Sequence, residues 1–311
     1  GTLYGRNTMG GLIKVYTRSP LKYQGTMLRA GMGSYLGIDA DAAHYGKINN
    51  RLGYSVSANY HHTNGYFKNQ YTGKSVDEQN AASGRIRLEW RPSEQMQIGY
   101  NTNLDYINQG GYPYAVYDPA NGHIADVSYN DPGRYRRLMS TSGVSVNYQA
   151  AAYSINSQTS FQHLNDRQAI DQDFTDEALY YARQWQSQNM ISEEFNIKSN
   201  SHSRYSWLFG AFAFWQQIDN CVWLDYLNKR KRSEKNYELP TQGLAFYHQS
   251  VLQDLGVKGL SLTLGLRYDL EWARMDYSGM MRQWTGTETD GTREKTTPLE
   301  PFLSKLHFGQ L

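Results

Sequence analysis

Leu260-Ser-Leu-Thr-Leu-Gly-Leu-Arg-Tyr-Asp-Leu-Glu-Trp272 is the stretch that decides the fold, because apolar and polar side chains alternate through all thirteen positions. In an extended strand, this alternation places leucine, tyrosine and tryptophan on one face and polar or small residues on the other. A strand in a soluble sheet has about five or six residues, whereas a tilted strand that crosses a bilayer needs roughly nine to eleven. The stretch is therefore long enough to cross a bilayer, with one face suited to hydrocarbon and the other to water.

The same alternation recurs along the chain, and helical periodicity is scarce. Amphipathic strands are predicted at 52–61, 84–91, 96–106 and 153–162, and about a dozen such strands fit the whole chain. No run of eighteen apolar residues is present, so the sequence excludes a transmembrane helix. The mean hydropathy of −0.71 is compatible with a membrane barrel, because only every second residue of a barrel strand faces lipid. These patterns predict an all-β protein that forms part of a transmembrane antiparallel β-barrel.

The predicted connections alternate between short and long. Short links are expected at 48–51, 91–94, 149–152, 200–204 and 253–259, and long segments at 63–79, 110–137, 165–183, 218–239 and 275–297. An outer-membrane barrel has short periplasmic turns and longer extracellular loops. Trp90 and Trp272 lie near strand ends on the apolar face, where an interfacial aromatic girdle is expected, although ordinary core packing explains either residue alone.

Charge and cysteine content exclude several classes of partner and site. The formal net charge is +2, which is not the footprint of a nucleic-acid-binding protein, and the basic run Lys229–Arg232 is expected in a solvated loop. Cys221 is the only cysteine, so the chain contains neither an internal disulfide nor a multi-cysteine metal site.

The amino end has a different character. Residues 1–20 read GTLYGRNTMGGLIKVYTRSP, which indicates a glycine-punctuated turn followed by a strand that ends at Pro20. A phosphate-binding loop is excluded, because no lysine followed by serine or threonine trails the glycines.

Three stretches resemble landmarks of TonB-dependent outer-membrane receptors. The first resembles the end of the plug domain just before the barrel, and it comprises Leu3, Tyr4, Gly5, Arg6, Asn7, Gly10 and Gly11 together with 12–20. The other two resemble a mid-barrel strand pair, at 191–195 with 205–212, and the next hairpin, at 244–249 with 264–269. Lys14 and Val15 depart from the asparagine and aliphatic residue that the family commonly has there.

The resemblance implies a 22-stranded barrel whose lumen is closed by a plug. Residues 1–20 would be the end of the plug, and 21–311 the N-terminal half of the barrel, with about twelve strands. Most of the plug, the TonB box and the later strands would then lie outside this sequence, so the chain is expected to be a fragment.

The function that the resemblance implies is active uptake across the outer membrane of a Gram-negative bacterium. The expected ligand is an iron–siderophore complex, with haem, cobalamin and glycans left open, and no resident cofactor is expected. The expected partners are that ligand, outer-membrane lipid and the TonB complex, which would act through the absent N-terminal region. A passive porin or adhesin barrel and a soluble β-rich binding module are the alternatives.

Ligand contacts are expected from the long segments, since these would face the outside. Aromatic faces and guanidinium groups suit a ferric catecholate or hydroxamate through stacking, cation–π contacts and charge pairing. The candidates are Tyr112, Tyr114, Tyr117, Arg134, Tyr135, Arg136, Trp223, Tyr226 and Trp284, with Arg137 beside them. For each of them, packing within a loop and its rim is the alternative interpretation.

No catalytic or metal site is predicted. Asp166, Asp171, Asp173 and Asp176 share one segment, but the glycine and glutamate of an EF-hand loop are missing, so solvated charge is favoured over calcium binding. His61 and His62 point to opposite faces of a strand. Because no Ser-His-Asp or paired-carboxylate arrangement is evident, an enzyme is not expected.

The stretch 260–272 is expected to be the eleventh strand, ascending from the periplasm, with Trp272 at the outer girdle and an extracellular loop at 275–297.

Overall fold

The computed structural model describes residues 15–200, 204–285, 293–299 and 305–310. The plug-end motif at residues 3–11 therefore lies outside the described part of the chain. Within the described residues, no helix is long and apolar enough to cross a membrane.

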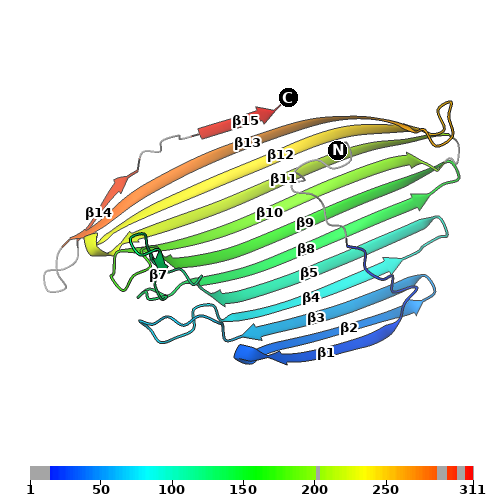
Figure 1. Cartoon of the computed structure of the whole chain (residues 1–311). Coiled ribbons are helices and arrows are strands. Elements are labelled where there is room, and N and C mark those ends of the chain that lie inside the picture. The colour runs from blue at the N-terminus through cyan, green and yellow to red at the C-terminus, as the bar shows by residue number, and fades with distance from the viewer. Residues whose placement is uncertain (1–14, 201–203, 286–292, 300–304, 311) are drawn as a thin grey trace.

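One large antiparallel sheet contains most of the described residues (Figure 1). Its strands, in spatial order, are β1 (Gly25–Gly33), β2 (Gly37–Asn49), β3 (Leu52–Thr63), β4 (Gln79–Trp90), β5 (Met96–Gly110), β8 (Arg134–Gln149), β9 (Tyr153–Asp171), β10 (Tyr180–Ser199), β11 (Tyr205–Tyr226), β12 (Lys231–Leu252), β13 (Leu262–Thr285) and β14 (Arg293–Pro298). The last strand, β15 (Lys305–Gln310), pairs with β13 farther along the same edge. The connection that joins β5 to β8 contains a separate small hairpin of β6 (Tyr117–Asp118) and β7 (His123–Ile124). The prediction of an all-β, antiparallel fold is confirmed, and β13 is the eleventh strand along the sheet order, as expected.

The sheet has two chemically different faces, which the strand registers define. The pairing stays in register along β3 to β13, so one set of alternate residues faces the same side throughout. On β4, Arg87 hydrogen-bonds through Nη1 to the carbonyl oxygen of Thr17 at 3.3 Å, so the segment before β1 lies on the Arg87 side. We call this side the inner face; it includes Arg267 of β13. The opposite side, which includes Leu266, is the outer face.

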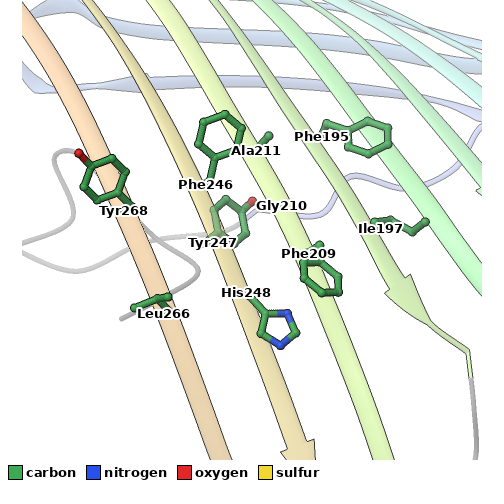
Figure 2. Close-up of a pocket in the computed structure, with 10 residues that line it drawn as sticks. All are labelled: Phe195, Ile197, Phe209, Gly210, Ala211, Phe246, Tyr247, His248, Leu266 and Tyr268. Carbon is green, nitrogen blue, oxygen red and sulfur yellow. The ribbon is translucent and has the colours of Figure 1, made fainter.

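The outer face carries a band of exposed apolar side chains, which we call the outer belt. Figure 2 shows the part of it where Phe195, Phe209, Phe246 and Leu266 extend from neighbouring strands. Farther around the sheet, the belt continues through Phe161, Val144, Leu138, Leu104, Tyr100, Ile86 and Val56. A contiguous exposed apolar surface of this kind is rare on soluble monomers and is the rule on the lipid side of a membrane barrel.

On β11 to β13, tryptophans mark the upper limit of the belt. Trp215 pairs in register with Gln242, which pairs with Trp272, so both indole rings lie on one row across the sheet. On β13, the exposed large apolar residues begin at Leu262 and end at Trp272. This placement supports the prediction of an outer girdle at Trp272, since tryptophan favours the membrane boundary.

A carboxylate interrupts the belt on β10. Glu193 faces outward and accepts hydrogen bonds from the hydroxyl groups of Ser157, at 2.6 Å, and Thr159, at 2.5 Å, on β9. These hydroxyls satisfy the carboxylate oxygens, which reduces the cost of placing an ionisable group on an apolar surface.

The inner face is polar and hydrogen-bonded. The phenol oxygen of Tyr247 lies 2.8 Å from Glu194 Oε1 and 2.7 Å from Asn196 Oδ1. The guanidinium of Arg267 lies over the Tyr247 ring and pairs with Asp269 at 2.8 Å. Glycine at position 210 makes room for this arrangement, since a Cβ there would lie 2.1 Å from the Tyr247 ring.

The strands from β9 to β13 are much longer than a bilayer crossing requires. They have between 19 and 24 residues, against the roughly nine to eleven of a membrane-spanning strand. The loop predicted at 218–239 is consequently wrong. That predicted at 275–297 is wrong at 275–285 and at 293–297, with 286–292 outside the described residues, and that predicted at 165–183 is shortened. Instead, β11 runs to Tyr226, a tight turn with Arg230 in the left-handed region follows at φ 50°, and β12 starts at Lys231. The basic run predicted in a loop lies partly in this turn and partly in β12. Outside a membrane both strand faces meet water, so the apolar alternation stops although the backbone ladder continues.

Two of the predicted long connections are present, at 64–78 and at 111–133; the second is shorter than the predicted 110–137, because β8 starts at Arg134. They pack against one another around a small core of Val76, Val127 and Tyr129. Asn69 ties them together by donating its side-chain amide to the carbonyl oxygen of Tyr129 at 2.8 Å.

The segment before β1 approaches the sheet at its short-turn end. The backbone N–H groups of Lys22 and Tyr23 donate to the carbonyl oxygen of Ser19, and Pro20 is fully buried. Glycine at position 53 makes room for this close approach, because a Cβ there would lie 3.1 Å from the backbone of the segment at Pro20 and Leu21.

Candidate ligand-binding site

The candidate contact residues divide between the two faces and the loops. Tyr135 on β8 and Tyr226 on β11 face inward, as does Arg137. The outward-facing candidates are Arg134, Arg136, Trp223 and Trp284, on β8, β11 and β13. Those in the connection between β5 and β8 are Tyr112, Tyr114 and Tyr117. The structure therefore does not bring the nine predicted residues into one site.

Strand geometry explains this division. Trp223 and Tyr226 are an odd number of residues apart on one strand, so their side chains point to opposite faces. From the sequence both are predicted in a loop, where no such rule applies. Of the predicted contact residues that the structure places on strands, Tyr135, Arg137 and Tyr226 face the interior.

The inward-facing residues near the long-loop end form a polar and aromatic surface, which we call the inner wall. Its members are Tyr135, Arg137, Asp166, Tyr180, Tyr226, Tyr237 and Tyr277. The rings of Tyr180 and Tyr226 meet edge to face with centroids 5.7 Å apart, and those of Tyr237 and Tyr277 lie 5.2 Å apart. From β8 to β13 the wall spans about 24 Å, given strand spacings near 4.8 Å.

Three members of the inner wall are not among the residues predicted from the sequence, namely Tyr180, Tyr237 and Tyr277. Strand parity identifies them, because an even spacing or a register match with the inward-facing Arg267 and Tyr226 places a side chain on the inner face. Parity can be used only when the full length of each strand is known. Once β12 and β13 are extended to their observed ends, both Tyr237 and Tyr277 fall on the inner face, directly opposite each other in register.

Burial is the main influence on the pKa values of the acidic groups at the β8–β9 part of the wall. The phenol of Tyr135 donates to Asp166 Oδ2 at 3.4 Å. Burial raises the pKa of the Asp166 carboxyl, and it also raises the pKa of the Tyr135 hydroxyl, with the nearby Asp166 charge acting in the same direction. The wall thus offers a phenol donor, a guanidinium and several ring faces, which suit a planar, oxygen-rich ligand.

The two outward-facing tryptophans belong to a self-contained cluster. Asp225, which is 6% exposed, accepts from Arg183 at 2.6 Å and from Arg232 at 2.5 Å. The guanidinium of Arg232 lies 4.6 Å from the ring centroid of Trp223 and 5.4 Å from that of Trp284. Because the cations and the carboxylate already satisfy one another, this cluster is suited to holding β10 to β13 together and not to recognising a ligand.

The loop candidates Tyr112 and Tyr114 take part in packing between connections. Their rings lie 5.6 Å apart, and Tyr114 also contacts Phe174 at 4.9 Å. The Tyr129 hydroxyl lies 3.4 Å from the Tyr112 carbonyl oxygen. Burial, with the Asp171 charge next, raises the pKa of Tyr129 to about 12. Tyr117 is the most exposed of the three predicted loop tyrosines, at 58%.

Three of the four aspartates considered as calcium ligands have separate structural roles. Asp166 faces inward from β9, whereas Asp171 accepts N–H groups from Asp131, Asp173 and Phe174. Asp173 accepts in turn from the N–H of Tyr180. Among the described residues, no three His, Cys, Asp or Glu side chains converge as metal ligands would.

Solved structures with the same architecture are known. The ferric yersiniabactin uptake receptor FyuA from Yersinia pestis aligns with a TM-score of 0.75 and 15% identity, over 99% of this chain and 47% of that one. The ferripyoverdine receptor of the outer membrane of Pseudomonas aeruginosa aligns with a TM-score of 0.54 and 9% identity, over 85% and 42%. The FrpB iron transporter from Neisseria meningitidis aligns with a TM-score of 0.50 and 11% identity, over 90% and 49%. No protein-family model matches the sequence.

These three structures are TonB-dependent outer-membrane receptors. The chain has the barrel fold of TonB-dependent outer-membrane receptors. The fold class predicted from the sequence is thereby confirmed. The chain spans about half the length of the receptors that it matches, with 47%, 42% and 49% of their chains covered.

Proposed function

We propose that this chain is part of a receptor of the Gram-negative outer membrane that imports a scarce ligand by TonB-dependent transport. The observation that carries the proposal is the two-faced sheet, with an apolar outer belt and a polar inner face. The N-terminal segment lies against the inner face through Arg87 and Thr17. A sheet of this kind places lipid on one side and a filled, polar lumen on the other.

Residues 1–20 are proposed to be the end of a plug domain, and 21–311 the N-terminal half of the barrel. Arg87 and Arg91 both pair with Glu89, which is 1% exposed, where the segment meets the sheet. A segment held on the inner face favours a plugged receptor over the alternative of a passive porin, whose lumen is open to water.

The ligand class that the inner wall supports best is a ferric siderophore. Its five tyrosines, with Arg137 and Asp166, combine ring faces, hydroxyl groups and charge, which match the chelating oxygens and planar groups of such complexes. The neighbours FyuA and the ferripyoverdine receptor are named for ferric siderophores, which supports the same class here. The proposed role is transport and not catalysis, and the proposed partners are the iron chelate, outer-membrane lipid and the TonB complex.

Uptake of radiolabelled ferric siderophore tests the proposal directly. We expect a strain that lacks the full-length gene to lose uptake, complementation to restore it, and loss of TonB to abolish it. The control is a strain that lacks TonB but produces the protein with its inner-face tyrosines intact. This strain should bind the ferric siderophore without importing it. Uptake that continues unchanged without TonB would refute active transport and favour the porin alternative.

A further inference from the structure

The outer face has a group of arginines just above the belt that differs from the other arginines on that face. On β10 to β13, the outward-facing arginines each have a carboxylate partner. Arg183 and Arg232 share Asp225, Arg274 pairs with Asp276 at 2.8 Å, and Arg282 pairs with Glu234 at 2.8 Å. Within the described residues, the structure records no ion pair for Arg134, Arg136 or Arg167 on β8 and β9.

These three arginines are exposed and lie next to one another. Arg136 and Arg167 are directly opposite in the β8–β9 register, and Arg134 is the next outward-facing residue after Arg136 on β8. Arg134 and Arg136 both donate through Nε to the same amide oxygen, Asn108 Oδ1, at 3.0 and 3.2 Å. Like charges directly opposite on neighbouring strands destabilise a sheet, so this arrangement favours an anion bound between them.

The position of the group relative to the belt identifies the kind of anion. Leu138 and Tyr106 are paired in register, are exposed, and lie at the top of the belt on β8 and β5. Arg136 is two residues farther along β8, which is about 6.6 Å at a rise near 3.3 Å per residue. An anion held there therefore lies at headgroup depth, immediately above a surface that suits acyl chains.

We propose that Arg134, Arg136 and Arg167 form a binding site for the phosphate of a phosphorylated lipid in the outer leaflet, whose acyl chains pack on Leu138 and Tyr106. Guanidinium groups bind phosphate through paired N–H donors, and three of them hold one or two phosphates without a carboxylate competitor. The inference rests on the proposed function in one respect, the placement of the outer belt in the outer membrane. It adds a lipid partner for a surface separate from the inner wall.

The test uses the full-length protein purified in detergent, with diphosphorylated lipid A as the probe and native mass spectrometry as the readout. We expect the double substitution Arg136→Gln/Arg167→Gln to weaken lipid A binding at least tenfold. Arg274→Gln is the matched control, since it removes the same charge from the same face but from a residue with a carboxylate partner; its effect should stay within twofold. Because all three positions are exposed strand surface, a heat-modifiable band on a gel confirms that each variant forms a closed barrel.

Two results would overturn the lipid site. One is equal affinity of the wild type and the double variant for lipid A. The other is displacement of lipid A by inorganic phosphate at equal concentration, which would show a free-anion site that does not use the belt. Failure of the proposed function is distinguishable, because the protein would then be absent from the outer-membrane fraction, whereas failure of the lipid site alone leaves membrane location and uptake unchanged.

Discussion

Replacing Leu266 with arginine tests whether the outer belt faces lipid. Leu266 lies on β13 and is 74% exposed. It is six residues below Trp272, which corresponds to about 20 Å along the strand at a rise near 3.3 Å. With a strand tilt of about 45°, the difference in height is about 14 Å, close to the middle of an apolar band about 25 Å tall.

The expected cost follows from that depth. Arginine at the bilayer midplane of a β-barrel costs about 2–4 kcal/mol, whereas a substitution on an exposed soluble surface stays within about 0.5 kcal/mol. Guanidinium-induced unfolding of the full-length protein in liposomes, followed by tryptophan fluorescence, measures the difference. Thr263→Arg, three residues away on the inner face of the same strand, is the control and should change stability little. Equal, small effects of both substitutions would refute the lipid-facing assignment of the belt.

Three further predictions concern the charge cluster, the loops and the inner wall. Asp225→Asn should lower the free energy of unfolding by about 1–3 kcal/mol, because two guanidinium groups lose their shared carboxylate. Asp276→Asn, at a more exposed ion pair, should lower it by about 0–1 kcal/mol. Equal costs in denaturant titrations would contradict the role of the charge cluster in holding β10 to β13 together. Since the folded pKa of Tyr129 is raised to about 12 from 10.0, its neutral form favours the folded state, so stability should be fully present below pH 10 and lost as the pH rises towards 12. Tyr129→Phe should remove this loss, and identical stability–pH curves would argue against burial of the phenol. Tyr135→Ala on the inner wall should raise the Kd for a ferric siderophore about tenfold, or about 1.4 kcal/mol, while Trp223→Ala on the outer face should leave the Kd unchanged. Fluorescence quenching measures both values, and the reverse result would contradict ligand binding at the inner wall.

The strands within the belt were predictable because each face of the sheet meets a different solvent. Leu260 to Trp272 alternates for that reason, and the same alternation located the strands at 52–61 and 84–91, which the structure confirms as β3 and β4. Above Trp272 both faces of the sheet meet water, so the sequence around residues such as Trp223 and Trp284 has no apolar–polar alternation that would indicate a strand. Their strands continue because backbone hydrogen bonds form regardless of side-chain polarity.

The candidate site was only partly predictable, for a related reason. Composition indicated that tyrosine and arginine near the long connections were the relevant residue types, and Tyr135 and Tyr226 do lie on the inner wall. Whether a given residue faces the lumen depends on strand parity, which has no meaning in a segment that is predicted to be a loop. Tyr237 and Tyr277 were missed on that account.

By itself, the sequence determined the class of fold and the order of the strands, because a period of two and the spacing of turns are local properties. Tertiary structure alone decided which strands extend beyond the membrane and which side chains meet across them. Arg136 and Arg167 lie on different strands and become neighbours through the register of β8 with β9. Register is a property of two paired segments, so neither segment carries it alone.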